Sequence, residues 1–390
     1  MVSYAHQLIP ARNSERHGLA SDTPHRPGSE DYEKVPRTSP APSIAQRFSA
    51  WRLFLQLCVF PLFASAVFSA AAQAQTSIVL VGSGSSVPAP LYTRWTQEYG
   101  KRDANIQIRY LPIGTSEGIN EISRGASDFG AGEAQLTAAQ RKEGSLTALP
   151  VVLIGIVLIY NLPDLHGELR LSGDVLAGIF LGEVNNWNAP QIAKLNPDVP
   201  LPNLAIKVIN RSAGKGSNYV FTDFLSKVNA KFRTEVGVSA SPKWPVGEAA
   251  ERSSDVADKV KNIPGSIGYV EYQYALKANI PQAAVLNPAG RFVKASMDTI
   301  AAACAAVEEP RWNNFSASLT NVPGVESYPI TSFTWIYLRT TAPDAARTAA
   351  MSDLLDWIYS DGQRSAALEG YSALPAHLLA EVRKKAKALQ

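Results

Sequence analysis

Three segments rich in glycine and hydroxyl side chains carry the residues best suited to chemistry in this sequence. They span residues 82–88, 114–118 and 211–217, and each follows an apolar, strand-like run and precedes a stretch with helical spacing. The first N–H groups of a helix lack intrahelical partners and lie at the positive end of its dipole, so they favour a bound anion. Arg211 adds a cation to the third segment. One such loop is usually only a turn, but the three together predict an anion-binding site.

The same segments allow two catalytic interpretations. The second segment matches G-x-S-x-G, the pattern of the nucleophile elbow, which would make Ser116 the attacking hydroxyl of an esterase. That chemistry needs a histidine base, and neither His166 nor His377, the only histidines after residue 74, lies in the expected strand-end loop. A nucleotide phosphate loop in the third segment would need a glycine where Ile209 stands. We therefore expect a binding protein without enzymatic activity, with the Ser116 esterase as the catalytic alternative.

The composition excludes several classes of protein. The net charge of +3, from 37 basic and 34 acidic groups spread along the chain, is too small for a protein that coats nucleic acid, so we expect no nucleic-acid partner. Two cysteines, Cys58 and Cys304, cannot build a disulfide framework or a multi-cysteine zinc site. Cys304 stands among alanines and is predicted to pack inside the protein from a helix. With two histidines after residue 74 and no clustered carboxylates, we expect no metal and no cofactor.

The N-terminal region has the pattern of an export signal. An apolar run over residues 53–68 follows Arg52 and precedes the small-residue pattern Ala-x-Ala at 72–74, which predicts a signal peptide over residues 47–74 and cleavage directly after it. A transmembrane anchor is the alternative, but the run is shorter than the roughly 20 apolar residues that a bilayer needs and contains a glutamine and a proline. Residues 1–46 are polar and rich in Pro and Ser, which indicates a disordered extension or a misassigned start codon.

Apolar runs with strand character alternate with helical stretches along the rest of the chain. The expected strands cover residues 77–81, 106–111, 151–160, 205–209, 266–272 and 331–338. The expected helices cover residues 91–101, 117–124, 172–181 and 218–228, followed by C-terminal helices within 345–387. This alternation predicts an α/β fold in which helices cover a sheet. A chain of this length normally divides into two domains.

Several short motifs occur between residues 77 and 387. They are Pro-Ala-Pro-Leu-Tyr at 88–92 with Trp95, Asp-Phe-Gly-Ala at 128–131, Ile-Phe-Leu-Gly at 179–182 with Trp187, Leu-Asn-Pro at 195–197, Val-Phe-Thr-Asp-Phe-Leu at 220–225, Lys-Trp-Pro at 243–245 and Pro-Gly-Ser-Ile-Gly-Tyr-Val-Glu-Tyr at 264–272. In these motifs the chain resembles the periplasmic phosphate-binding proteins of high-affinity phosphate ABC transporters. Most of these residues are expected at packing and turn positions, so they identify the family and not the ligand.

The resemblance implies a type II periplasmic-binding-protein fold, an α/β architecture of two lobes in which each lobe is a mixed sheet flanked by helices. It places residues 77–150 and 326–390 in lobe I and residues 151–325 in lobe II. Crossing strands would join the two lobes, and the lobes would close by a hinge motion on a ligand in the cleft between them.

The resemblance also implies a role. The chain would be a monomeric, periplasmic solute-binding protein that captures inorganic phosphate and delivers it to inner-membrane ABC permease subunits, which would touch the exposed rims of both lobes. Because a fold does not determine a role, a secreted phosphate sensor or assembly protein without a transport role is the alternative.

The ligand-binding residues follow from the resemblance, position by position. The positions that would donate a hydrogen bond are Ser86, the Val87 N–H, Thr115, Arg211, the Gly216 N–H and Ser217. Val87 stands where the family has an aromatic residue. Glu133 takes the place of the family's aspartate, whose carboxylate can only accept a hydrogen bond and so favours an oxyanion that still carries a proton, such as phosphate, over sulfate.

Further positions depart from the family pattern. Ala213 replaces an aspartate beside the arginine, Lys215 replaces a serine donor, and residues 248–254 replace a glycine-rich stretch and are interpreted as a rim loop. With Arg211 and Lys215 counted against Glu133, the charge around the ligand would be +1, where the family pattern has −1. If Lys215 pairs with Glu133 or reaches solvent, the ligand stays phosphate. If it faces the ligand, the site would prefer a more highly charged or larger phosphorus oxyanion, such as pyrophosphate or a phosphonate.

Overall fold

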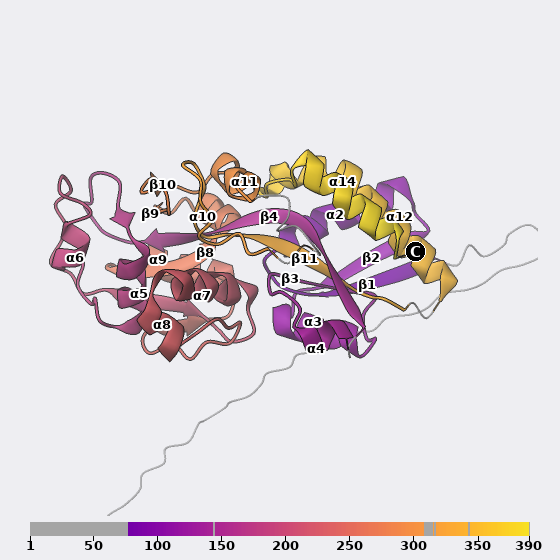
Figure 1. The fold of residues 1–390 in the computed structure, drawn as a ribbon, viewed down its shortest axis with the longest axis horizontal. Helices are drawn as coiled ribbons and strands as arrows, with labels where there is room; N and C mark the ends of the chain where they lie inside the picture. Colours follow the sequence, from indigo (N-terminus) through magenta and orange to yellow (C-terminus); the bar gives the residue numbers. More distant parts are fainter. Residues whose placement is uncertain (1–76, 143–144, 308–314, 316, 342–343, 390) are drawn as a thin grey trace, which may run out of the picture. The chain divides into compact units, whose positions relative to one another are not determined.

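The computed structural model describes residues 77–389 except 143–144, 308–314, 316 and 342–343 (Figure 1). The predicted signal peptide at 47–74 and the extension at 1–46 lie outside the described residues. Among the helices of the described part, none is both long and apolar enough to cross a membrane.

One sheet of eight strands organises the described chain, in the order β2-β1-β3-β11-β4-β8-β6-β7. The strands are β1 (Ile78–Gly84), β2 (Ile106–Leu111), β3 (Phe129–Gly132), β4 (Leu146–Tyr160), β6 (Lys207–Arg211), β7 (Glu248–Ala250), β8 (Ser266–Glu271) and β11 (Thr331–Arg339). β1, β2 and β3 are parallel to one another, and so are β6, β7 and β8. β11 is antiparallel to β3 and β4, and β4 is antiparallel to β8.

Strand β4 joins the two sets of parallel strands. Its first part pairs with β11, and its last five residues, from Ile156 to Tyr160, pair with β8. These pairings direct the carboxyl ends of β1, β2 and β3 toward those of β6, β7 and β8. Gly132, at the end of β3, pairs with Trp335, which is opposite Pro150, whereas Glu271, at the end of β8, pairs with Ile156. The turns that follow the two sets of strands therefore face each other across the middle of β4.

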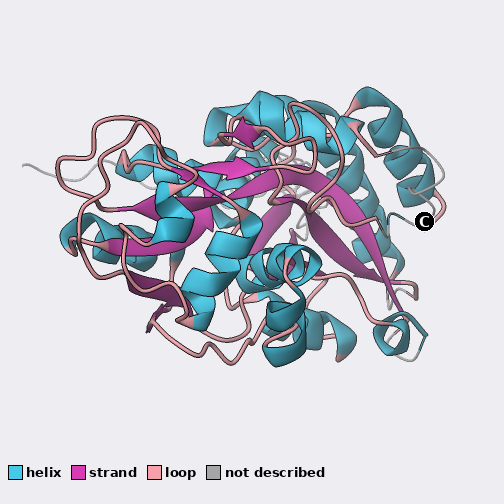
Figure 2. Ribbon diagram, turned by 60° about the vertical axis from the view of Figure 1, so that its left-hand side comes forward, coloured by secondary structure: helices cyan, strands magenta, loops and turns pink. Residues whose placement is uncertain are grey.

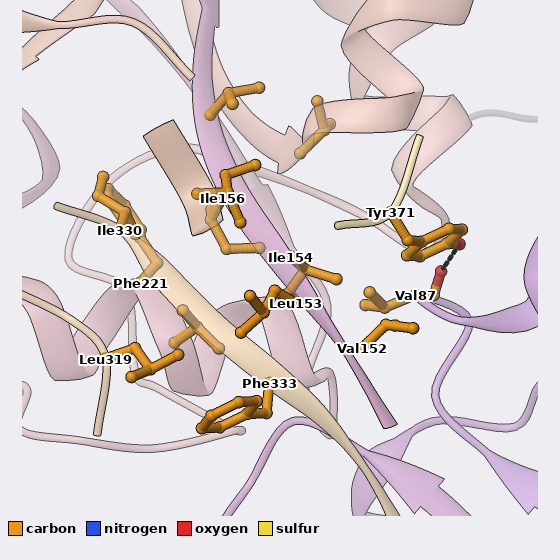
Figure 3. Close-up of a cluster of buried hydrophobic side chains, with 14 of the residues drawn as sticks. Val87, Val152, Leu153, Ile154, Ile156, Phe221, Leu319, Ile330, Phe333 and Tyr371 are labelled. Atoms are coloured by element: carbon orange, nitrogen blue, oxygen red, sulfur yellow. Dashed lines mark hydrogen bonds between the residues drawn. The ribbon is translucent and has the colours of Figure 1, made fainter. Parts of the chain in front are cut away.

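The predicted strand at 151–160 is confirmed, and it begins earlier, at Leu146. Its β-branched and aliphatic side chains are buried on both faces, as expected of a central strand covered on both sides. Figure 3 shows Val152, Leu153, Ile154 and Ile156 of this strand near Ile330 and Phe333, in a cluster of buried hydrophobic side chains.

Helices flank the strands, as Figure 2 shows. In chain order they are α2 (Ala89–Arg102), α3 (Thr115–Ser123), α4 (Ala138–Lys142), α5 (Gly173–Leu181), α6 (Pro190–Ala193), α7 (Gly216–Val228), α8 (Ala230–Glu235), α9 (Ser253–Asn262), α10 (Tyr272–Ala278), α11 (Met297–Ala305), α12 (Ala345–Trp357), the π-helix η3 (Ile358–Gly362), α13 (Gln363–Ala366), the 3-10 helix η4 (Ala367–Glu369) and α14 (Ala376–Lys387). The strands β5 (Arg170–Leu171), β9 (Ala284–Leu286) and β10 (Phe292–Val293) form a second, small sheet. The predicted alternation of strands and helices is confirmed.

Local signals in the sequence account for several element boundaries. Ser172 caps α5, because its hydroxyl accepts a hydrogen bond from the Val175 N–H at 3.3 Å. Cys304 is fully buried on α11, which confirms its predicted packing role. The strand expected at 205–209 is shifted by two residues, since β6 extends to Arg211. That shift puts the arginine at the end of a buried strand rather than in the following loop.

Candidate functional site

The three predicted turns follow the carboxyl ends of parallel strands. The turn after β1 leads to α2, the turn after β2 leads to α3, and the turn after β6 leads to α7. Gly114 and Lys215 immediately precede α3 and α7, and neither makes a side-chain cap. The first N–H groups of these two helices are therefore not satisfied by a capping side chain and can serve an anion. Gly114 has φ 107°, a left-handed conformation that glycine adopts without strain.

Arg211 connects the two facing sets of turns. Its side chain is fully buried, and Nη1 donates to the Ser217 hydroxyl at 3.2 Å and to the Ser253 hydroxyl at the start of α9. Nη2 donates to the Glu251 carbonyl at 3.1 Å and to the Ser86 hydroxyl at 3.4 Å. Ser86 follows β1, and Arg211 ends β6. This guanidinium therefore brings together hydroxyl groups from the turns after both sets of parallel strands.

Glu133 lies directly after β3 and is 1% exposed. The Thr115 hydroxyl donates to its Oε2 at 3.1 Å. The same oxygen packs against Gly216, where an added Cβ would lie 1.7 Å from it. Burial raises the pKa of Glu133 to about 8, and the charge of Glu271 adds to this rise, whereas hydrogen bonds from Ser85 and Thr115 and the Arg211 charge oppose it. The carboxyl group therefore holds a proton in this arrangement at neutral pH.

Lys215 makes an ion pair that was not among the arrangements expected for it. Its ammonium group forms an ion pair with the carboxylate of Glu251, in the segment interpreted as a rim loop, and its side chain is 13% exposed. The pair lowers the pKa of Glu251. A Cβ on Gly114 would lie 3.8 Å from the Lys215 Nζ, so the ammonium group stands beside the start of α3. Lys215 is thus close to the site, with its charge balanced by a residue that the sequence interpretation did not consider.

The predicted donors of the first turn have partners within the chain. The Val87 N–H donates to the Ser85 hydroxyl at 3.1 Å, so it would have to share or exchange this bond to serve a ligand. The Val87 carbonyl accepts hydrogen bonds from Tyr371 at 2.6 Å, drawn in Figure 3, and from Gln273 at 3.3 Å. These contacts hold the first turn in place. The other predicted donor of this turn, Ser86, accepts a hydrogen bond from Arg211 through its hydroxyl oxygen.

The eight predicted ligand-binding residues therefore lie close together, at the ends of β1, β2 and β3 on one side and at the end of β6 on the other. They are Ser86, Val87, Thr115, Glu133, Arg211, Lys215, Gly216 and Ser217. The arrangement offers one guanidinium, several hydroxyl groups, two helix N-termini and a carboxyl group that can accept or donate a hydrogen bond. This set suits a small tetrahedral oxyanion, since it has donors on several sides and a partner for one ligand proton.

Ser116 also lies at this site, as the second residue of α3, and its N–H donates to the Gly214 carbonyl at 3.3 Å. His166 lies exposed between β4 and β5, and His377 is exposed on α14. Among the described residues no hydrogen bond joins either histidine to Ser116. Neither histidine is therefore placed to act as the base that a Ser116 nucleophile would need in this arrangement. The described residues also contain no group of three or more metal-ligating side chains.

Sequence reasoning missed three residues of this site. Ser253 bonds Arg211, Glu251 pairs with Lys215, and the fully buried Glu271 lies with its Oε1 3.5 Å from the Arg211 Nη1. The expected surplus of +1 around the ligand is therefore wrong, because the two cations Arg211 and Lys215 pair with the carboxylates of Glu271 and Glu251, and Glu133 holds a proton. A signal for Glu271 was present, since it ends the motif at 264–272, but that motif was interpreted as packing and turn positions.

Comparison with known proteins agrees with this geometry. A model of the PBP superfamily domain matches residues 69–362. The phosphate-binding protein PstS of Pasteurella multocida (strain Pm70) is 36% identical over 321 residues, which cover 82% of this chain and 92% of the relative. The phosphate-binding protein PstS of Xylella fastidiosa (strain 9a5c) is 34% identical over 312 residues, which cover 80% and 85%.

Solved structures of phosphate-binding proteins have a similar fold. A high-affinity periplasmic phosphate-binding protein bound with phosphate aligns with a TM-score of 0.62 and 21% identity, over 79% of this chain and 93% of that chain. An ABC-type phosphate transport receptor from Vibrio cholerae aligns with a TM-score of 0.52 and 15% identity, over 76% and 100%. The predicted periplasmic-binding-protein fold of type II is confirmed. The chain belongs to the PBP superfamily and, within it, to the family of the phosphate-binding proteins PstS.

Proposed function

We propose that this chain captures inorganic phosphate and delivers it to the membrane subunits of an ABC-type phosphate permease, without covalent chemistry. The observation that carries this proposal is that Arg211 gathers the hydroxyls of Ser86 and Ser217. Beside them, Thr115 donates to the buried carboxyl group of Glu133, which packs against Gly216 at the start of α7. Family membership supports the same ligand, since the relatives with more than 30% identity are called phosphate-binding proteins.

We further propose that residues 77–150 and 326–390 form lobe I and residues 151–325 form lobe II. The exchange of pairing along β4, from β11 to β8, supports this division. Under it, the contact between Arg211 and Ser86 and the contact between Glu133 and Gly216 join the two lobes. Opening would break both contacts and expose the site, and closure on a ligand would restore them.

The Glu133 carboxyl group gives the proposal a basis for selectivity. In the open form, water would reach Glu133 and the carboxyl would ionise at neutral pH. Closure buries it, so it needs a proton there, and phosphate brings one that the two groups can share. Sulfate at neutral pH brings none, so binding it would require a proton from solution or leave two anions in contact.

Export to the periplasm and a monomeric state complete the proposal, with the permease touching the exposed rims of both lobes. The residues that bear on the export signal lie outside those described. A secreted phosphate sensor would share the same site, and the presence or absence of a permease operon beside the gene separates the two roles.

Calorimetry of the chain from residue 75 onward tests the ligand. The protein is first partially unfolded to remove bound ligand, and the refolded protein is titrated with phosphate, sulfate and pyrophosphate at neutral pH. We expect tight phosphate binding and no heat from sulfate. Absence of phosphate binding refutes the proposal, and tighter pyrophosphate binding would replace the ligand with a larger phosphorus oxyanion.

A further inference from the structure

Glu271, the last residue of β8, is a fully buried carboxylate with few stabilising contacts. Its Oε1 lies 3.5 Å from the Arg211 Nη1, and neither of its oxygens accepts a hydrogen bond from any described residue. Burying an ionised carboxylate costs free energy that one ion pair without hydrogen bonds offsets poorly. A residue in this environment contributes little to stability, but it lies against the arginine of the anion site.

The position of Glu271 follows from the sheet. β6 and β8 are parallel neighbours, so Arg211 and Glu271 end adjacent strands at the same edge. Arg211 therefore has the carboxylate of Glu271 on Nη1, together with the Ser217 and Ser253 hydroxyls, and the Ser86 hydroxyl on Nη2. Ala213, which stands where the family resemblance implied an aspartate, carries a methyl group that cannot supply a charge.

Two buried carboxyl groups are under the influence of the Arg211 charge: Glu271, which forms an ion pair with it, and Glu133. The charge of Glu271 acts on Glu133 and favours its protonated form, and the Arg211 charge acts on it in the opposite direction. The titratable or charged groups that face these two carboxyl groups from the surrounding elements are Arg211 of β6, Tyr269 of β8, Tyr274 of α10, Tyr92 of α2, Tyr110 of β2, Tyr337 of β11 and Tyr371 after η4. The tyrosines among these groups are buried or partly buried, and burial raises the pKa of each, so they stay neutral at physiological pH.

We propose that Glu271 is a positioning residue that supplies the counter-charge of Arg211 and thereby makes the anion site select an oxyanion that carries a proton. This inference rests on the proposed phosphate-binding function and extends it. With Glu271 ionised, the guanidinium brings hydrogen-bond donors to the ligand but no surplus positive charge. Discrimination is then left to the proton that the ligand must share with Glu133. Without Glu271, the unpaired guanidinium would attract a fully deprotonated oxyanion such as sulfate.

The test compares Glu271→Gln with the ligand-stripped wild-type protein by calorimetry with phosphate and with sulfate, from about pH 6 to about pH 9. Gln keeps the size of the side chain and removes the charge. We expect the ratio of sulfate to phosphate affinity to rise at least about tenfold, and the pH dependence of phosphate binding to move to lower pH, because Arg211 would then act on Glu133 alone.

Two further variants separate this role from general electrostatics. Glu248→Gln removes one negative charge from Lys259 instead of Arg211, and the Glu248 side chain is 60% exposed, so the ratio should change less than about threefold. Glu271→Asp keeps the charge but withdraws it by one methylene, so it should largely restore wild-type selectivity and the wild-type pH profile.

The outcomes distinguish this inference from the proposed function. Wild-type protein that binds no phosphate refutes the function. Wild-type protein that binds phosphate, together with a Glu271→Gln variant of unchanged selectivity and pH profile, overturns the role of Glu271 alone. An equal change in Glu248→Gln overturns it as well. If Glu271→Gln does not fold, the Asp variant decides, since a rise of about tenfold in its ratio of sulfate to phosphate affinity, despite the retained charge, would then overturn the proposal.

Discussion

Replacing Glu133 by Gln should make the ligand-free protein more stable than wild type, and this gain in the free energy of unfolding should grow as the pH rises. The carboxyl group is 1% exposed, and burial raises its pKa from 4.5 to about 8. An acid whose pKa is raised by folding contributes stability that is present in full below pH 4.5 and is lost as the pH rises through about 8. Gln has similar shape, can accept the Thr115 hydrogen bond and has no proton to lose.

The magnitude follows from the pKa difference. Each pKa unit corresponds to about 1.4 kcal/mol, so the stability gained by Glu133→Gln should grow between pH 4.5 and 8 toward an upper limit of about 5 kcal/mol. The measured gain will be smaller if the lobes of the empty protein open, because water then reaches the carboxylate without unfolding.

The assay is urea unfolding of ligand-stripped protein at about pH 5, 7 and 9, followed by tryptophan fluorescence. Glu251→Gln is the matched control with the opposite sign, because the pKa of Glu251 is lowered by Lys215 and its contribution is lost as the pH falls. A stability difference between Glu133→Gln and wild type that stays constant from pH 5 to pH 9 would refute the assignment of a buried, protonated carboxyl group.

Three further predictions concern single side chains of the site. Gly216→Ala should weaken phosphate binding by at least about tenfold in calorimetry, because its Cβ would lie 1.7 Å from the Glu133 Oε2, whereas Gly100→Ala, with nothing within 4 Å, should bind as wild type does. Ser116→Ala should leave phosphate affinity unchanged, and neither this variant nor wild type should hydrolyse an ester. Hydrolysis by wild type that the variant lacks would support the Ser116 esterase. Lys215→Ser should change phosphate affinity less than about threefold, because Glu251 balances its charge, and a large loss for pyrophosphate in the same titrations would identify Lys215 as a ligand contact.

Much of the fold was predictable from local patterns. The apolar run within β4, the capping serine of α5 and the Gly/Ser turns before α3 and α7 are each encoded in neighbouring residues. The end of β6 was misplaced by two residues because the polar Asn210 and Arg211 do not look like strand residues, although both are buried. Burial of a polar strand end depends on what packs over it, and local sequence does not report that.

The donors of the site were also accessible from sequence, because helix starts and hydroxyl groups are local features. The charges were not. Glu271 reaches Arg211 from 60 positions along the chain, and Glu251 reaches Lys215 from 36, because β8 and β7 lie on either side of β6 in the sheet. The sequence by itself predicted an anion site with one arginine and, through the family resemblance, one acceptor carboxyl group. The tertiary structure decided how many carboxylates surround it and that Glu133 holds a proton, because ionisation and charge balance depend on burial and on distances that exist only once the strands are paired.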